Sequence, residues 1–183
     1  MLWLLQSKNQ KERGFYFMKK IIAVLILFSI AFSGAEVFAI SGLEATKIDL
    51  TTPCGYSAKE LSKGLSGELF DLTEEFLAAE EKYGVNALFL CAVAALESGW
   101  GKYCFRPNNI FGWSGKDFES KADCIDFVAS KIAEHYLSED GKYYNGKTVS
   151  GVNVCYNGSD FWKNKIPVLM AMISKRIEKS EGN

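Results

Sequence analysis

The sequence predicts a mainly α-helical protein with one helix buried at its centre. Apolar residues recur at helical spacing over about residues 66–83, 120–137 and 160–178. Between the first two of these segments, every residue from Ala87 to Leu96 is apolar. A helix that is apolar all round is buried on all sides, and this one is too short to cross a bilayer. The remaining stretches are short and rich in turn residues, which leaves little room for a sheet.

Capping residues mark the ends of the helices around this central segment. Gly84 is expected to end the preceding helix in the position that glycine favours, and Asn86 is expected to cap the central helix. Glu97 stands at the C-terminal end of that helix, where Gly99 and Gly101 stop it. A single ionisable group therefore ends the most apolar segment of the chain.

The second half of the chain is expected to alternate loops with two further helices. Residues 106–119 form a loop with room for a very short hairpin, and Ser120 to Asp123 matches a capping box that starts the next helix. Residues 138–159 are turn-rich. The last helix is expected from about Asp160 to Glu178, with a kink at Pro167.

Residues 1–39 are interpreted as an upstream extension followed by a secretory signal peptide. Lys19 and Lys20 precede an apolar run, and cleavage is expected after Ala39, so that Met18 is the expected start. The alternative is an uncleaved membrane anchor, although Glu36 interrupts the apolar stretch.

The rest of the chain is long enough for one domain with a single core. We expect a lead-in segment over 40–63, the domain over 64–179 and a tail over 180–183. Residues 40–183 carry 16 basic and 20 acidic side chains, so their net charge is near −4 and no basic stripe predicts a nucleic-acid partner. A monomer is expected, with membrane contact only through an uncleaved anchor.

The five cysteines all follow the predicted signal peptide, which permits disulfides in an oxidising space. They are Cys54, Cys91, Cys104, Cys124 and Cys155. An odd number leaves at least one thiol free, and we expect this to be Cys91 because it lies inside the apolar run. Cys104 and Cys155 fall in predicted loops and form the expected pair. The sequence has no CxxC or Cys/His cluster, so neither a metal site nor a cofactor is expected.

Three influences raise the expected pKa of Glu97. They are burial, the negative end of the helix dipole, and the loss of water if Trp100 and Phe111 fold nearby. A carboxylic acid that stays protonated near neutral pH is what a glycosidase needs to protonate a leaving oxygen. The alternative is an ordinary glutamate that reaches solvent from the end of its helix.

Three blocks of the sequence, in this order, resemble the glucosaminidase domains of glycoside hydrolase family 73, which are bacterial cell-wall hydrolases. The blocks are "ALESGWGKY…NNIFGW", "CIDFVASKIAEHYL" and "GKYYNGKTVSGVNVCYNGSDFWKNKI". The resemblance covers about residues 64–175. It implies a lysozyme-like fold with a minimal or absent β-lobe. It also implies a secreted or wall-associated enzyme that cleaves β-1,4 bonds of peptidoglycan, most often on the N-acetylglucosamine side.

The resemblance also assigns roles to two residues and to an asparagine pair. Glu97 matches the catalytic acid, and Tyr156 matches a tyrosine across the cleft whose phenol could orient water or the substrate's acetamide group. Asn108 and Asn109 match the asparagine pair of the family, and they could either touch sugar or only hold the shape of their loop.

Three aromatic residues are further candidates for substrate binding, because sugar faces stack on aromatic rings. They are Trp100, Phe111 and Trp113, and for the tryptophans the alternative is packing inside the protein. Many family members carry a second carboxylate after the asparagine block. Here only Asp117 and Glu119 are available in a short loop, where solvated charges are the alternative. The substrate's own N-acetyl group could replace a second acid.

The expected function is therefore an endo-β-N-acetylglucosaminidase acting on peptidoglycan glycan strands. A lytic transglycosylase or muramidase on the same fold is one alternative, although a Gly-Leu-Met-Gln block typical of transglycosylases is absent. The other alternative is a domain that binds the wall without cutting it.

Overall fold

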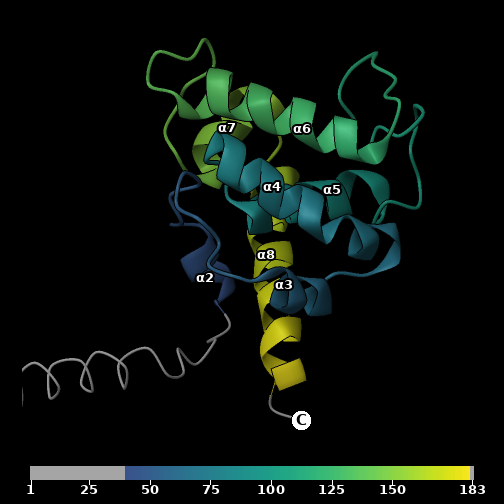
Figure 1. Ribbon diagram of the computed structural model, residues 1–183. Coiled ribbons are helices and arrows are strands. Elements are labelled where there is room, and N and C mark those ends of the chain that lie inside the picture. The colour runs from purple at the N-terminus through teal and green to yellow at the C-terminus, as the bar shows by residue number, and fades with distance from the viewer. Residues whose placement is uncertain (1–39, 182–183) are drawn as a thin grey trace, which may run out of the picture. The chain divides into compact units, whose positions relative to one another are not determined.

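The computed structural model describes residues 40–181, so the predicted start and signal peptide lie outside the described residues. The elements are α2 (Gly42–Ala45), α3 (Ala58–Gly64), the 3₁₀ helix η1 (Gly67–Leu72), α4 (Thr73–Tyr83), α5 (Ala87–Ser98), α6 (Lys121–Ile132), the π-helical turn η2 (Ala133–Leu137), α7 (Val149–Tyr156) and α8 (Asp160–Glu181) (Figure 1). Residues 40–181 contain no strand, which confirms the mainly α prediction.

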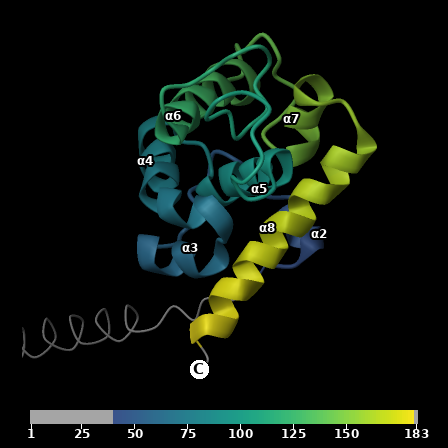
Figure 2. The ribbon, with the colours of Figure 1, turned by 90° about the vertical axis from the view of Figure 1, so that its right-hand side faces the viewer.

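Helix α5 is the central buried helix that its composition predicts. Every residue from Ala87 to Ala95 is buried, and Figure 2 shows α5 in the middle of the other helices. Its first turn is held from two sides, because Asn86 Oδ1 accepts from the Phe89 amide at 3.0 Å and Glu80 Oε2 accepts from the Ala87 amide at 2.6 Å. Such capping fixes the direction in which the helix delivers its C-terminal end.

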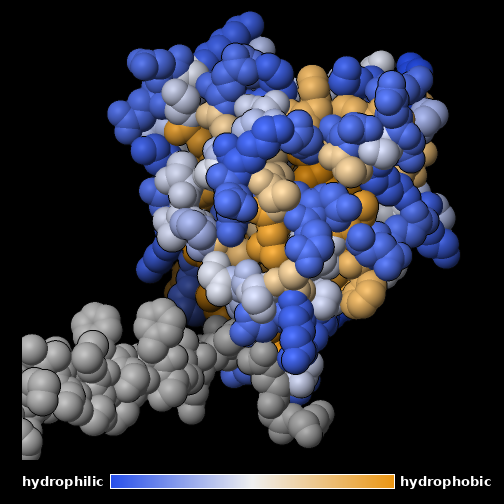
Figure 3. Space-filling model, viewed as in Figure 1, coloured by the Kyte–Doolittle hydropathy of each residue, from blue (hydrophilic) through white to orange (hydrophobic). Residues whose placement is uncertain are grey.

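Helix α8 packs against α3 and α5 and supplies a large part of the core. Its buried apolar residues recur every three or four positions, as the sequence predicts, and they are Trp162, Ile166, Leu169, Met170, Ile173 and Ile177. Pro167 lies inside this helix, and the kink expected there stays a prediction. On the face shown in Figure 3, hydrophilic residues surround the hydrophobic ones that reach the surface.

Two elements differ from the sequence prediction for local reasons. The helix expected over 66–83 is divided into η1 and α4, because Leu72 between them has φ −107° and ψ 16°, outside the helical region. Gly67, with a φ of +60°, begins η1 and packs its backbone against the Trp100 carbonyl. Helix α7 lies in the segment expected to be only turns. Its signal is weak because it is short and contains Gly151, where a Cβ atom would lie 2.3 Å from the Gly146 carbonyl oxygen.

The cysteine prediction is partly confirmed and partly wrong. All five cysteines are free thiols, and Cys91 is fully buried as expected. The pairing of Cys104 with Cys155 is wrong, because Cys155 lies exposed on helix α7 and not in a loop, while Cys104 lies against the Gly101 carbonyl. Within residues 40–181, no helix is both long enough and apolar enough to span a bilayer.

Replacing Gly64 by alanine is expected to destabilise the protein by about 1–3 kcal/mol, because α3 and α8 touch there without a side chain between them. A Cβ at Gly64 would lie 2.7 Å from a methyl group of Ile173 and 2.8 Å from the Ile173 carbonyl oxygen, which cannot rotate away. Urea unfolding measures the change. Gly42→Ala is the control, since nothing lies within 4 Å of its Cβ position, and equal stability of both variants would contradict the close packing.

Candidate active site

A cleft of about 440 Å³ opens beside the C-terminal end of α5. Its lining comes from the end of α5, the 111–114 loop, η2, α7 and the turns that flank α7: Glu97, Phe111, Gly112, Trp113, Ser114, Tyr136, Tyr143, Cys155, Tyr156 and Asn157. Glu97 is the only carboxylate in this lining, and its side chain is exposed to the open cleft. The buried helix α5 therefore ends with one carboxylic acid at the wall of a cavity.

The carboxyl group of Glu97 is held by a tryptophan from the buried face of α8. Trp162 Nε1, from the first turn of α8, donates to Glu97 Oε1 at 2.9 Å, and Trp162 itself is 1% exposed. Its ring packs edge-on against Phe89 of α5, with centroids 6.4 Å apart. Because Trp162 is buried, its indole holds one carboxyl oxygen against the core. The other oxygen, Oε2, lies 3.5 Å from the position that a Cβ on Gly112 of the cleft lining would take.

Burial raises the pKa of Glu97, because the surrounding protein removes water that would stabilise the carboxylate. The hydrogen bond from Trp162 acts in the opposite direction, since it stabilises the charged form. One side of the Glu97 side chain faces the open cleft and the others face protein, so burial and the hydrogen bond from Trp162 both act on its pKa. The pKa stays above the ordinary value of 4.5, as the sequence predicts.

Tyr156 lies at the end of α7 in a cluster of aromatic rings. Its ring centroid is 5.3 Å from that of Trp162, 5.8 Å from Tyr136 and 6.2 Å from Trp113. Its hydroxyl donates to the Phe111 carbonyl oxygen at 3.4 Å, a long and weak hydrogen bond. Burial raises the pKa of Tyr156 and the negative charge of Glu97 raises it further, so the phenol stays protonated and able to donate.

A pair of tyrosines completes the wall of the cleft, although no motif of the sequence predicts them as site residues. Tyr136 belongs to η2 and Tyr143 to the following turn, with ring centroids 5.2 Å apart. The spacing of Tyr136 along the sequence is that of a core residue. It lines the cleft because η2 follows α6 and because Tyr156 of α7 packs against its ring. The tyrosine-rich "GKYYNG" stretch was the available signal for Tyr143.

The asparagine pair holds the loop beside the cleft. Asn109 is buried, with its Nδ2 donating to the carbonyls of Trp113 at 2.7 Å and Lys116 at 2.9 Å, while its Oδ1 accepts from the Trp113 amide at 2.9 Å. Asn108 has a φ of +57° and donates to the carbonyls of Phe118 and Glu119, both at 2.9 Å. Of the two expected roles, these bonds support the structural one.

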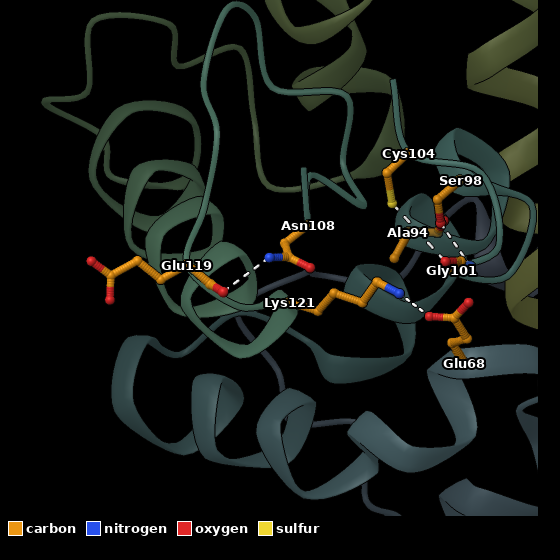
Figure 4. A network of polar contacts seen from close by, with 8 residues as sticks. All are labelled: Glu68, Ala94, Ser98, Gly101, Cys104, Asn108, Glu119 and Lys121. Carbon is orange, nitrogen blue, oxygen red and sulfur yellow. Dashed lines mark hydrogen bonds and ion pairs between the residues drawn. The ribbon is translucent and has the colours of Figure 1, made fainter. Parts of the chain in front are cut away.

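Hydrogen bonds of Ser98 stabilise the turn that follows Glu97 (Figure 4). Ser98 Oγ donates to the Ala94 carbonyl at 2.6 Å and accepts from the Gly101 amide at 2.8 Å. Below this turn, Lys121 at the start of α6 forms an ion pair with Glu68 of η1. The acid therefore sits between a capped helix and a fixed turn, which limits its freedom.

Besides the asparagine pair, three residues predicted to bind substrate do not line the cleft. The Trp100 ring instead lies under the Arg176 guanidinium of α8, 4.9 Å from its centroid. Asp117 forms an ion pair with Arg106, and in Figure 4 the Glu119 carboxyl points away from Asn108. The structure does not bring either acid to Glu97, because the short loop is anchored by the asparagine bonds. Phe111 and Trp113 do line the cleft, as predicted.

Cys155 is expected to react with N-ethylmaleimide at least about tenfold faster than the other thiols, because it is the exposed cysteine and lies in the cleft wall. Burial raises the pKa of Cys54 to about 12 and that of Cys124 to about 11, which keeps both thiols protonated. Peptide mapping by mass spectrometry measures the order of labelling. Cys155→Ser is the control, and equally fast labelling of buried Cys91 would contradict the packing of α5.

The chain is similar to known proteins in sequence. Residues 73–174 match the model of the glucosaminidase family, described as mannosyl-glycoprotein endo-beta-N-acetylglucosaminidase. Two proteins of Streptococcus pneumoniae, strains TIGR4 and R6, each described as "Putative endo-beta-N-acetylglucosaminidase", are 35% identical over 146 residues. The match covers 70% of this chain but only 22% and 21% of those proteins, so the chain spans about a fifth of their length.

The solved structures with a similar fold include autolysin E of Staphylococcus aureus. A catalytic mutant of that protein, in complex with the disaccharide NAG-NAM, superposes with a TM-score of 0.59 and 23% identity over 75% of this chain and 73% of the other. A second structure of autolysin E gives a TM-score of 0.58 and 24% identity over 81% and 77% of the two chains. These matches confirm the expected lysozyme-like fold around a central buried helix.

Proposed function

The chain belongs to the glucosaminidase family, and from that premise we propose that it hydrolyses β-1,4 glycosidic bonds of peptidoglycan as an endo-β-N-acetylglucosaminidase. The observation that carries this proposal is Glu97, the one carboxylate of the cleft lining, held by the indole of Trp162 and with a raised pKa. The names of the pneumococcal relatives and the disaccharide bound by autolysin E support the same substrate class.

In the first step, Glu97 acts as the general acid. Its proton passes to the glycosidic oxygen as the bond between that oxygen and the anomeric carbon breaks, so the leaving sugar departs as a neutral alcohol. The raised pKa keeps the proton available at a pH where an ordinary glutamate is ionised. The bond to Trp162 sets the direction in which the other carboxyl oxygen faces the substrate.

As the nucleophile that displaces the leaving sugar, we favour the acetamide group of the substrate over a second protein carboxylate. Glu97 stands alone in the cleft lining, while retaining enzymes with two acids place their carboxyl groups about 5–5.5 Å apart. The acetamide oxygen of the sugar attacks the anomeric carbon as the leaving oxygen departs, and forms a cyclic oxazolinium ion that keeps its N–H proton and faces the Glu97 carboxylate. Water then attacks the anomeric carbon, opens this ring and gives one proton to the Glu97 carboxylate, which restores the acid. The two successive inversions at the anomeric carbon retain its configuration.

We assign to the phenol of Tyr156 the role of orienting the acetamide group. Two observations support this: the phenol stays protonated, and Tyr156 and Glu97 line the same cleft. Tyr156→Phe keeps the ring contacts and removes the hydroxyl, so we expect kcat to fall by about 10²-fold with little change in stability. Initial rates on purified peptidoglycan and a urea unfolding curve measure the two effects. Tyr103→Phe, at a 66% exposed tyrosine outside the cleft lining, is the control. Unchanged kcat in Tyr156→Phe would remove the phenol from the mechanism.

The proposal is tested by digesting purified peptidoglycan, reducing the products and identifying their ends by mass spectrometry. Reducible N-acetylglucosamine ends support the proposal, and reducible muramic ends would assign a muramidase. The lone carboxylate also fits a lytic transglycosylase, whose products carry an anhydro end and are lighter by one water. If the folded protein binds the wall and releases no ends, the domain is a binding module.

The place of action follows from the substrate, and we propose that the protein works outside the cell membrane, in the wall. The predicted signal peptide that would export it lies in residues 1–39, outside the described residues. Residues 40–181 contain no membrane-spanning helix. Mass spectrometry of the N-terminus from culture fractions tests cleavage after Ala39, and a retained N-terminus in membranes would support the anchor.

A further inference from the structure

A second cavity of about 280 Å³ adjoins the cleft that contains Glu97. The two cavities share Gly112, Trp113 and Ser114, and the second adds Phe105, Arg106, Asn109 and Gly115. Since three consecutive residues of one loop line both cavities, the two adjoin at this loop. A branched ligand held beside Glu97 is therefore close enough for its branch to reach the second cavity.

The charge of the second cavity differs from that of the first. Arg106 is the only charged residue in its lining, whereas Glu97 is the only charged residue in the lining of the first cavity. A guanidinium group binds carboxylates and phosphates through paired N–H donors, and it is a poor partner for a neutral sugar ring. The second cavity therefore favours an anionic part of a ligand.

The present partner of Arg106 is weak enough to be exchanged. Arg106 Nη1 lies 3.5 Å from Asp117 Oδ1, and the two side chains are 47% and 57% exposed. Ion pairs this long and this exposed contribute little to stability. A ligand carboxylate that approaches Arg106 in better geometry can replace the Asp117 contact at small cost.

Phe105 gives the same cavity an apolar edge. Its side chain is 98% exposed, so it packs against almost nothing in the protein although it lines the cavity beside Arg106. A ligand that contacts Phe105 would cover an aromatic ring that water otherwise surrounds, which favours binding. The cavity thus combines one cation with one uncovered ring, a pairing that suits a small peptide carrying both methyl groups and carboxylates.

We propose that this second cavity binds the acidic stem peptide attached to the glycan strand, with Arg106 pairing with a peptide carboxylate and Phe105 covering an apolar side chain. The inference rests on the proposed function, because it concerns the same substrate. In a glycan strand that bears peptides, N-acetylglucosamine is neutral and the lactyl carboxyl is bound in an amide, so the carboxylates belong to the peptides. Arg106 makes the enzyme prefer strands that still carry them.

The test compares kcat/KM on three preparations of one peptidoglycan, using the full chain. In the first the stem peptides keep their free carboxylates, in the second these are amidated chemically, and in the third an amidase has removed the peptides. Arg106→Ala is expected to lower kcat/KM about five- to tenfold on the first preparation and to leave the other two unchanged. Wild type is expected to lose the same factor on the amidated preparation, and Arg106→Lys to recover part of the loss.

Asp117→Asn is the matched control, because it removes the partner of Arg106 without removing the guanidinium. It is expected to match or exceed the wild type on the first preparation. An equal loss on all three preparations in Arg106→Ala would assign Arg106 to the sugar or to the loop, and a loss confined to stripped strands would assign it to the freed lactyl carboxylate. Either result, or no loss at all, overturns the inference. Absence of cleavage by wild type on every preparation would instead refute the proposed function.

Discussion

Replacing Glu97 by glutamine is expected to lower kcat on peptidoglycan by about 10²–10⁴-fold, the usual contribution of a positioned general acid. Glutamine has nearly the same shape and can still accept the hydrogen bond from Trp162, but it has no proton to give to the leaving oxygen. Release of reducible sugar ends measures the loss. Activity within about tenfold of wild type would remove Glu97 from the acid role, since proton transfer accounts for more than that.

The pH dependence of the wild type follows from the same residue. Glu97 must be protonated to act as the acid, so activity is expected to fall as the pH rises through its pKa. Because burial raises that pKa, this decline lies above the range of an ordinary glutamate, whose value is 4.5. A profile of kcat against pH locates the decline, and a decline centred below the ordinary value would contradict the environment described for the carboxyl group.

The folded state of the Glu97→Gln variant gives an independent check. A carboxyl group with a raised pKa contributes stability that is fully present below its unfolded value and is lost as the pH rises through the folded value. Glutamine has no such loss. The variant is therefore expected to equal the wild type in Tm near about pH 4 and to exceed it near about pH 7.5. A lower Tm of the variant at the higher pH would show that the carboxylate is favoured by the fold.

Replacing Trp162 by phenylalanine is expected to lower the maximal kcat by about 10–10²-fold, because it removes the indole N–H that holds the Glu97 carboxyl group in position. The hydrogen bond also stabilises the carboxylate form, so its loss raises the pKa of Glu97 further. The decline of activity with pH should then move to higher pH while the maximum falls. A variant that only damaged the fold would lower the maximum without moving the decline.

The control for this prediction is the neighbouring residue. Phe161 is 68% exposed on the same turn of α8, so Phe161→Leu changes an aromatic residue without touching Glu97. We expect it to keep both the rate and the pH profile. Trp162→Phe also removes volume from a fully buried site, and a loss of about 1–3 kcal/mol in urea unfolding is expected. Rates are therefore compared under conditions in which both variants are folded.

The sequence was most informative where one residue type controls one local feature. Ten consecutive apolar residues predicted a buried helix. Gly84 ends the helix before it, and Asn86 and Gly99 cap its two ends, as expected from their residue types. The acid at its end followed from that helix. These predictions depend on interactions between residues a few positions apart in the sequence, so they can be made from the sequence alone.

The parts that the sequence did not reveal depend on contacts between distant segments. Trp162 has the spacing of a core residue and is indeed buried, yet its ring nitrogen reaches the site. Tyr136 has the same pattern and lines the cleft. Conversely, Trp100, Asp117 and Glu119 are residue types that often bind sugars, yet none of them lines the cleft. Arg176 of α8 covers the Trp100 ring, and the hydrogen bonds of Asn109 hold the loop that carries the two acids away from Glu97. Periodicity identifies the inward face of a helix, and it does not tell which atom of a buried ring meets a polar partner.

The hydrogen bond between Glu97 and Trp162 joins residues 65 positions apart, and Tyr156 enters from a third helix. A nascent chain that ends before α8 can therefore form the acid-bearing helix without ever forming a working site. Under the proposed mechanism, the site is therefore complete only once α8 has docked against α5.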